Sequence, residues 1–129
     1  MRRIAITGGA GEVAALVRPH LSQRYELRLS DRRTATGLRA TERFVRADLR
    51  SPRQLYRALD GCDAVIHLGG IPREDRFERL LEMNVRATQT LLDAARSAGI
   101  RRVVIASTGH VTGFYPRRVA IDETDPVRP

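Results

Sequence analysis

Short apolar runs alternate along the chain with segments whose apolar residues recur every three or four positions. The short runs predict strands and the longer periodic segments predict helices. The predicted strands are residues 3–6, 25–31, 43–49, 62–70 and 102–107. The predicted helices are residues 12–24, 52–61 and 76–98, and residues 32–41 form a polar connection. This alternation is typical of an α/β fold, in which crossover helices join parallel strands.

Individual residues mark where these helices begin, bend and end. Ser51 and Gln54 predict a capping box at the second helix, and Pro52 suits its first position. Pro19 lies inside the first helix and predicts a kink, because proline removes a backbone donor. Gly99 predicts the end of the third helix. The first helix is indicated by apolar residues at helical spacing, namely Val13, Leu16, Val17 and Leu21.

Length and composition indicate one globular domain of 129 residues, 42% of them hydrophobic. No apolar run reaches the ~20 residues that a membrane-spanning helix needs. The first residues hold only about four apolar side chains before the glycines, which does not fit a signal peptide. We therefore expect a cytoplasmic protein without membrane association. The single cysteine, Cys62, excludes an intramolecular disulfide and a multi-cysteine metal cluster, and no metal site is expected.

The net charge of +8 raises the question of nucleic-acid binding. The 23 basic residues are all arginine, and they are scattered along the chain without a long basic run. Few aromatic residues are present to stack on bases. We expect no specific nucleic-acid partner.

The glycines between the first strand and the first helix form a candidate phosphate-binding loop. Gly8 permits a tight turn, Gly11 lets the backbone approach a pyrophosphate, and Ala14 lets the helix pack close to the strand. The amides of Glu12 and Val13 at the helix start favour an anion. The loop predicts a Rossmann-type, doubly wound parallel sheet.

Asp31 ends the second predicted strand, twenty residues after Gly11. At that place a carboxylate can accept hydrogen bonds from the ribose hydroxyls of an adenosine. It also repels the additional phosphate of NADP, so Asp31 favours NAD. Arg32 and Arg33 leave NADP open as the weaker alternative, because a guanidinium can neutralise that phosphate.

Five segments resemble the extended short-chain dehydrogenase/reductase family, also described as the NAD-dependent epimerase/dehydratase family. They are TGGAGEVA at 7–14, ADL at 47–49, HLGG at 67–70, NVRATQTLLDAA at 84–95 and RRVVIAST at 101–108. Within that family, HVTGFYPR at 110–117 looks like the uronate dehydrogenases. This resemblance implies oxidation of a hexuronic acid to an aldarolactone with NAD. A sugar acid is then the expected small-molecule partner.

The resemblance also implies where the cofactor is held. Asp48 and Leu49 would meet the adenine, and Leu68, Gly69 and Gly70 would line the path to the nicotinamide ribose.

Two further residues are expected to be structural. Asn84 would brace the central helix against the sheet. His67 lies in an apolar strand and is expected to be a hydrogen-bonded core histidine rather than a base.

The resemblance places the catalytic serine of the family at Thr108, which keeps the hydroxyl but adds a methyl group. His110 becomes a substrate contact that can address a carboxylate. Gly109 stands where these enzymes usually carry asparagine, and Pro72 where a serine often contacts substrate. These departures weaken the inference of a uronate substrate.

The family's general base is a tyrosine whose pKa is lowered by a lysine four residues later. The chain contains no lysine, and its tyrosines are followed at that spacing by Leu29, Asp60 and Val119. In the family the pair usually begins a few residues after a segment like DETDPVRP at 122–129. We expect residues 1–129 to be the cofactor-binding part of a dehydrogenase, inactive alone. A non-catalytic dinucleotide-binding or sensor module and a sugar-nucleotide epimerase/dehydratase fragment remain alternatives.

If the strands follow the usual order 3-2-1-4-5, residues 102–107 form an edge strand. Val103, Val104 and Ile105 would then be exposed next to unpaired backbone groups. Such an edge favours self-association.

Overall fold

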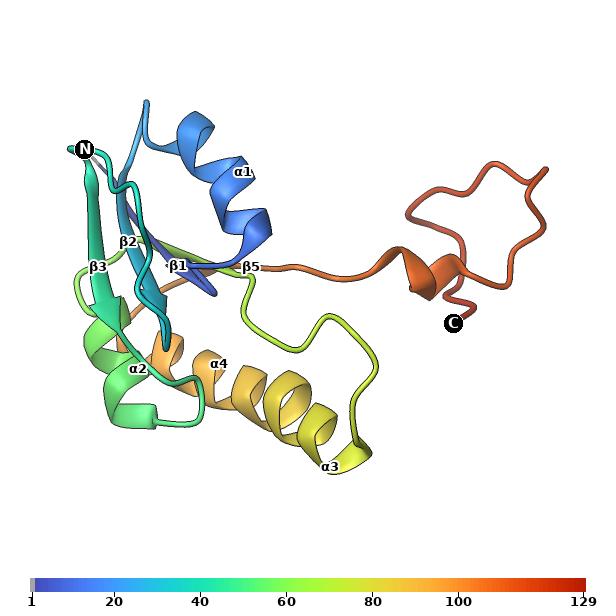
Figure 1. Cartoon of the computed structure of the whole chain (residues 1–129). Coiled ribbons are helices and arrows are strands. Elements are labelled where there is room, and N and C mark those ends of the chain that lie inside the picture. The colour runs from blue at the N-terminus through green and yellow to red at the C-terminus, as the bar shows by residue number, and fades with distance from the viewer. Residues whose placement is uncertain (1) are drawn as a thin grey trace.

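The computed structural model describes residues 2–129 and contains a five-stranded parallel sheet with helices on both faces (Figure 1). The strands are β1 (Arg3–Thr7), β2 (Glu26–Asp31), β3 (Glu42–Arg46), β4 (Ala64–His67) and β5 (Arg102–Ile105). The helices are α1 (Glu12–Leu21), α2 (Pro52–Leu59), α3 (Phe77–Leu80), the π-helical η1 (Leu81–Arg86), α4 (Ala87–Ser97) and the 3₁₀-helical η2 (Gly109–Thr112).

The strand order is β3-β2-β1-β4-β5, as predicted. β1 pairs with β2 on one side and with β4 on the other, so Thr7 lies opposite both Ser30 and His67. From β1 the chain adds β2 and β3 on one side of the sheet and then crosses over to add β4 and β5 on the other side, so the strand order reverses between β1 and β4. In a doubly wound sheet this switch point is where ligands bind, outside the carboxyl ends of the strands.

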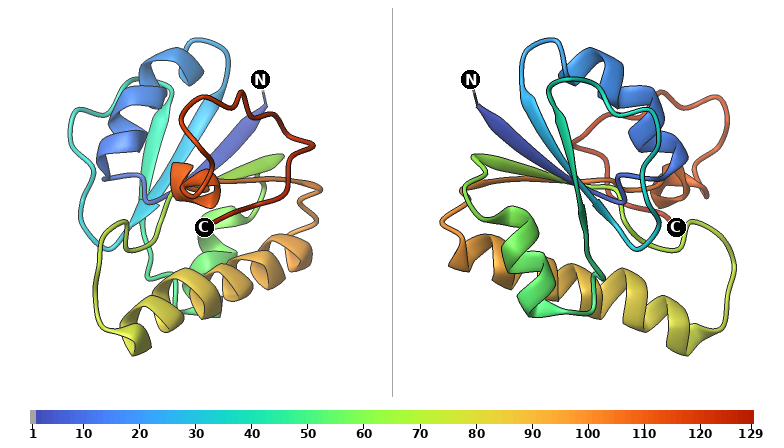
Figure 2. Two further views of the ribbon diagram at one scale, coloured as in Figure 1. Left: turned by 90° about the vertical axis from the view of Figure 1, so that its right-hand side faces the viewer. Right: turned by 60° about the vertical axis from the view of Figure 1, so that its left-hand side comes forward.

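Two apolar clusters fill the space between the sheet and its helices. α1 covers one face, while α2 and α4 cover the other (Figure 2). The cluster on the α1 face includes Ile6, Ala14, Leu27, Leu29 and Ala35. The cluster on the opposite face includes Leu55, Leu59, Val65, Leu91 and Ala95. The sheet is therefore buried on both faces near its centre, as a parallel sheet must be.

The side of α1 that packs on the sheet does not carry the largest apolar residues of the helix. Ala14 and Arg18 are buried, whereas Val13 and Leu16 are 54% and 72% exposed. The small side chain of Ala14 lets the helix approach β1, and this orients the helix. Pro19 lies within α1, which continues to Leu21.

The third predicted helix, residues 76–98, is formed by α3, η1 and α4 in succession, which together make one long helix from Phe77 to Ser97 that is not a uniform α-helix. Its residues 81–86 are π-helical, which the apolar periodicity did not predict. Phe77 and Val85 in its first half are 71% and 58% exposed. Gly99 ends the helix with a φ of +73°, as predicted.

The start of α2 differs in one hydrogen bond from the predicted capping box. Ser51 Oγ accepts from the Gln54 amide at 3.4 Å, as expected. The Gln54 side chain, however, accepts from the amide of Asp48 at 2.9 Å rather than from that of Ser51. The amide of Ser51 is used in a turn instead, because it donates to the Asp48 carbonyl at 3.0 Å.

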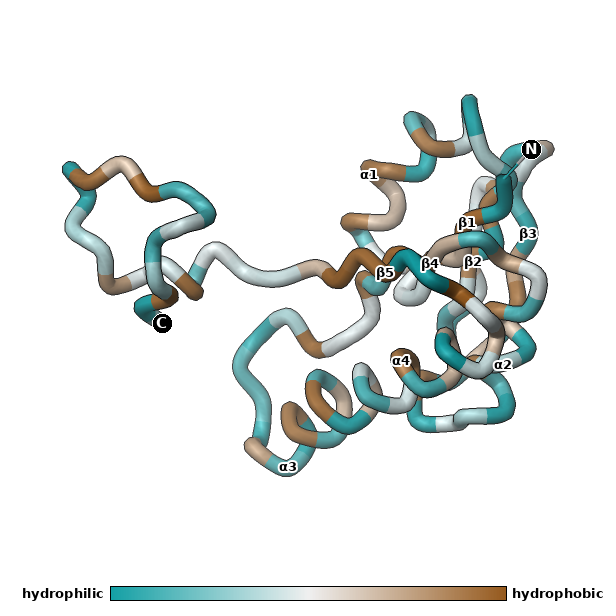
Figure 3. Tube along the Cα trace, turned by 180° about the vertical axis from the view of Figure 1, so that it is seen from behind, coloured by the Kyte–Doolittle hydropathy of each residue, from teal (hydrophilic) through white to brown (hydrophobic). Residues whose placement is uncertain are grey.

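The edge position of β5 is confirmed, with Val104 and Ile105 53% and 45% exposed. Val103, which was also expected to be exposed, is instead partly buried because it packs against the cluster on the α2 and α4 face. The strand is a visibly apolar stretch at the margin of the sheet (Figure 3). Residues 107–129 continue away from the sheet (Figures 1 and 3). They close on themselves, because the Tyr115 hydroxyl donates to the Pro126 carbonyl at 2.7 Å and the Arg128 guanidinium lies 4.5 Å from the ring centre of Tyr115.

Among residues 2–129, no helix combines the length and apolar character needed to cross a membrane.

Candidate dinucleotide-binding site

The turn between β1 and α1 packs against the neighbouring strands so closely that side chains are excluded. Gly8 has a φ of +71°, and a Cβ on it would lie 2.7 Å from the amide nitrogen of Gly69. The amide of Gly9 donates to the Ser30 carbonyl at 3.0 Å, and the amide of Gly11 donates to the Gly8 carbonyl at 2.9 Å. The missing side chains leave bare backbone at the sheet's switch point, as a pyrophosphate requires.

The start of α1 offers amide donors toward the same place. Gly11 is the N-cap and provides no side-chain acceptor. The amides of the first helical turn, which include those of Glu12 and Val13, have no partner within the helix because of helix geometry. Together with the helix dipole they favour an anion at this turn.

Asp31 ends β2 beside this turn, and both of its carboxylate oxygens already accept hydrogen bonds. The amide of Ala10 donates to Oδ2 at 3.3 Å, and the amide of Arg33 donates to Oδ1 at 3.0 Å. These bonds point the carboxylate at the glycine turn. Each oxygen keeps a free lone pair, so the group can still accept from ribose hydroxyls. Arg32 and Arg33 are exposed.

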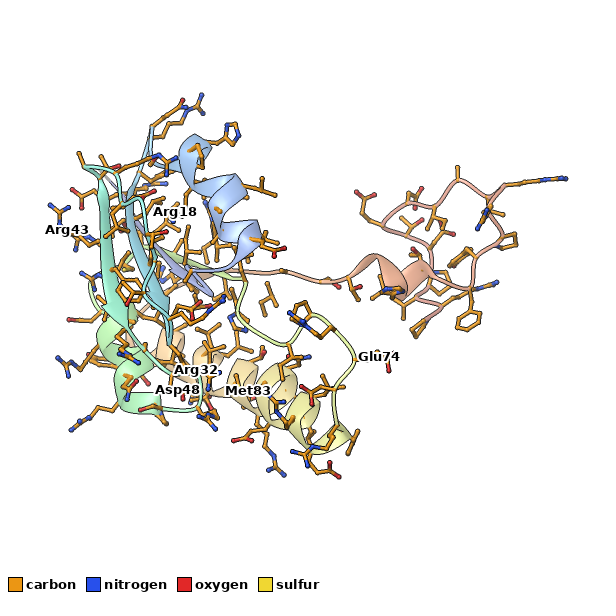
Figure 4. The ribbon with its side chains drawn as sticks, in the orientation of Figure 1. Arg18, Arg32, Arg43, Asp48, Glu74 and Met83 are labelled. Atoms are coloured by element: carbon orange, nitrogen blue, oxygen red, sulfur yellow. The ribbon has the colours of Figure 1, made fainter. Side chains whose placement is uncertain are left out.

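The turn after β3 presents a second fixed carboxylate, that of Asp48. Its Oδ1 accepts from the Arg50 amide at 2.9 Å and from Arg50 Nε at 3.0 Å, while Oδ2 accepts from Arg50 Nη2 at 2.7 Å. The Arg50 side chain lowers the pKa of Asp48 to about 2, and the charge of Arg32 acts in the same direction. Figure 4 shows Arg32 and Asp48 on the side of the molecule where β2 and β3 end.

The loop after β4 reaches the same edge of the sheet. The amide of Leu68 donates to the Thr7 carbonyl at 3.0 Å, so this loop starts beside the glycine turn. A Cβ on Gly69 would lie 2.7 Å from Leu49 Cδ1. The structure thus brings together Gly8, Gly69 and Leu49, which are far apart in the sequence.

Asn84 holds the next part of this loop. Its Oδ1 accepts from the Ile71 amide at 2.7 Å, and its Nδ2 donates to the Ile71 carbonyl at 3.0 Å. A Cβ on Gly70 would lie 2.9 Å from the same Oδ1, so glycine is needed there for this contact. Asn84 lies on the π-helical segment η1, so these two bonds tie that helix to the loop that leaves β4, in agreement with the predicted bracing role.

His67 is a buried, hydrogen-bonded core histidine, as predicted. Its Nε2 lies 3.2 Å from Thr88 Oγ1, which itself donates to the Asn84 carbonyl at 2.8 Å. Thr88 Oγ1 must therefore accept from Nε2–H, and Nδ1 accepts from Thr7 Oγ1 at 2.6 Å. Burial lowers the pKa of His67, in agreement with a neutral ring. The sequence did not indicate this network, which ties β1, β4 and the long helix together.

The predicted substrate residues lie on two separate segments. Thr108, Gly109 and His110 follow β5 and are exposed, with Thr108 Oγ1 accepting from the His110 amide at 3.2 Å. Pro72 is exposed in the loop after β4. The structure therefore gathers the predicted cofactor-side residues at one sheet edge, whereas the four predicted substrate residues lie exposed on two separate segments. Within residues 2–129, no cluster of His, Cys, Asp or Glu is arranged to hold a metal ion.

Residues 4–129 match the profile of the NAD dependent epimerase/dehydratase family. The chain belongs to this family. Uronate dehydrogenase from Agrobacterium fabrum is 35% identical over 130 residues, which are 100% of this chain and 49% of that protein. Uronate dehydrogenase from Pseudomonas syringae is 36% identical and covers 98% of this chain and 47% of its own length.

A solved structure also resembles this member of the epimerase/dehydratase family. A uronate dehydrogenase mutant from Agrobacterium tumefaciens complexed with NAD has a TM-score of 0.89 at 35% identity, covering 100% of this chain and 49% of its own. The predicted Rossmann-type fold and the NAD-dependent family are thereby confirmed. The chain spans about half the length of the curated relatives it matches.

Proposed function

We propose that residues 1–129 form the NAD-binding domain of an NAD-dependent dehydrogenase that oxidises a hexuronic acid. The observation that carries this proposal is the bare glycine turn at the switch point, where Gly8 and Gly69 are in contact, with Asp31 fixed beside it. The relatives named uronate dehydrogenase support the substrate class.

Different residues at this edge of the sheet bind different parts of NAD. The amides of Glu12 and Val13 hold the pyrophosphate, Asp31 accepts from the adenosine ribose, and Asp48 with Leu49 meets the adenine. The loop of Leu68, Gly69 and Gly70 lines the path to the nicotinamide ribose. Bound there, NAD supplies the acceptor for the hydride that leaves the anomeric carbon of the sugar.

On the substrate side, Thr108 donates or accepts a hydrogen bond at the sugar oxygen, and His110 addresses the carboxylate. Pro72 and Gly109 shape this side without polar side chains. Residues 1–129 contain no tyrosine followed four residues later by lysine. We therefore expect residues 1–129 to bind NAD without turnover.

Titration calorimetry with NAD, together with an assay of uronic-acid oxidation that follows reduced nicotinamide, tests the proposal. Saturable NAD binding without oxidation is the expected result. The absence of NAD binding to a folded chain would overturn the proposal, and oxidation by these residues alone would show that another group acts as base.

A second candidate is a dinucleotide-binding module without chemistry, because residues 1–129 hold the glycine turn and Asp31 but no tyrosine and lysine pair at the family's spacing. The coding sequence downstream of Pro129 separates the two. A Tyr-x-x-x-Lys motif in frame, with uronic-acid oxidation by the longer product, supports the dehydrogenase. A stop codon supports the module.

We also propose that the exposed β5 edge leads to self-association of residues 1–129. Val104 and Ile105 are about half exposed beside unpaired backbone groups. Light scattering on a size-exclusion column should show dimers or larger species, and replacing Val104 with lysine should shift them to monomer. A wild-type chain that stays monomeric at all concentrations contradicts this part.

A further inference from the structure

We infer that Arg50 is a positioning residue that makes the site select adenine, by locking the Asp48 carboxylate toward the 6-amino group of the base. This inference rests on the proposed NAD binding. Arg50 lies outside the glycine turn at residues 8–11, outside Asp31 at the end of β2, and outside the predicted substrate residues 108–110.

The contacts of Arg50 go beyond what the local turn needs. A bond from the Arg50 amide to Asp48 Oδ1, at 2.9 Å, is enough to form an Asx-turn. The guanidinium adds two bonds, from Nε to Oδ1 at 3.0 Å and from Nη2 to Oδ2 at 2.7 Å. This forked contact fixes the plane of the carboxylate, which the turn alone leaves free to rotate.

The backbone of Asp48 is fixed as well. Its amide donates to Gln54 Oε1 at 2.9 Å, and its carbonyl accepts from the Ser51 amide at 3.0 Å. On its other side, Arg50 Nη1 lies 3.6 Å from Glu82 Oε1 on the π-helical segment. The guanidinium is therefore held between the turn after β3 and the long helix.

One acceptor position of Asp48 stays open. Three donors from Arg50 occupy the carboxylate, two on Oδ1 and one on Oδ2, so Oδ2 keeps a free lone pair. The side chain is 22% exposed, so a ligand can reach it. A fixed anionic acceptor favours the 6-amino donor of adenine. It disfavours hypoxanthine, whose oxygen at that position would face the carboxylate.

Titrations of the full chain with NAD and with nicotinamide hypoxanthine dinucleotide test this role. We expect wild type to bind NAD about tenfold more tightly than the hypoxanthine compound, the size of effect of one charge-assisted hydrogen bond. In Arg50→Met this ratio should fall to about two, mainly through weaker NAD binding. Arg50→Lys, which keeps the charge without the fork, should give an intermediate ratio.

Arg57→Met is the matched control, because Arg57 is an exposed arginine on α2. It should keep the wild-type ratio, and circular dichroism should show that all variants fold. An Arg50→Met chain with the full wild-type ratio, or a wild type without preference between the two compounds, overturns the role of Arg50 while leaving NAD binding intact. A wild type that binds neither compound refutes the proposed function itself.

Discussion

Arg18 and Glu42 form a buried ion pair that joins α1 to β3. Arg18 Nη2 lies 2.6 Å from Glu42 Oε2, and the two side chains are 6% and 0% exposed. Arg18 also donates to the carbonyls of Thr36 and Gly37, and the Arg39 amide donates to Glu42. One charge pair thereby fixes the long connection between β2 and β3, directly after Asp31.

Replacing Glu42 with glutamine should destabilise the fold by about 3 kcal/mol, because it leaves the Arg18 charge buried without a counterion. Chemical denaturation measures this change. Burial opposes ionisation of Glu42, but hydrogen bonds from Arg18 and Arg39 hold its pKa below the ordinary value of 4.5. The pair therefore contributes stability above about pH 4.5, and this contribution is lost as the pH falls. The double variant Arg18→Met/Glu42→Leu should be more stable than Glu42→Gln, and equal loss in both would contradict the argument.

The glycine turn should not tolerate a methyl group at position 8. In Gly8→Ala the positive φ alone costs about 1 kcal/mol, and the new Cβ would also clash with the backbone of Gly69. Gly37→Ala is a matched control, since Gly37 has a φ of +59° and no atom within 4 Å of its Cβ position. Thermal melting should show a much larger loss for Gly8→Ala, together with loss of NAD binding. Similar losses in both variants would mean that only the φ angle matters.

The sheet and its order could be predicted because each strand is a local apolar run and each connection has a recognisable length. The glycine turn and Asp31 were also predictable, since both lie at fixed distances from the ends of these runs. Their contacts with Gly69 and the Ala10 amide depend only on the carboxyl ends of parallel strands meeting at one edge.

Features that depend on packing between distant segments were not predictable. The Arg18–Glu42 pair joins residues 24 positions apart. In the sequence, each of the two residues taken alone would be expected to be a charged side chain exposed to solvent. The orientation of α1 was missed because Ala14, rather than Leu16, decides which side meets the sheet. The π-helical segment is only six residues long, which is too short for its different spacing of apolar residues to be distinguished from that of an α-helix in the sequence.

The buried His67 should make stability depend on pH below its ordinary pKa of 6.5. Burial lowers the pKa of His67, so the unfolded chain takes up a proton there before the folded chain does. This contribution to stability is full above about pH 6.5 and declines as the pH falls. His67→Gln should remove the decline, although it lowers the melting temperature through the lost Thr7 contact. His20→Gln, an exposed site, should keep it, and an unchanged slope in His67→Gln would refute the assignment.

Asp31 should decide between the two nicotinamide cofactors. Its carboxylate is aimed at the glycine turn by the Ala10 and Arg33 amides, so it accepts from a ribose diol and repels a phosphate on that ribose. Asp31→Asn keeps the shape but removes the charge, and NAD binding should weaken about tenfold while NADP binding stays equal or improves. Calorimetric dissociation constants for both cofactors measure the shift. Asp63→Asn, on an exposed residue before β4, should leave the preference unchanged. Wild-type binding that is tighter for NADP than for NAD would show that Arg32 and Arg33, rather than Asp31, set the choice.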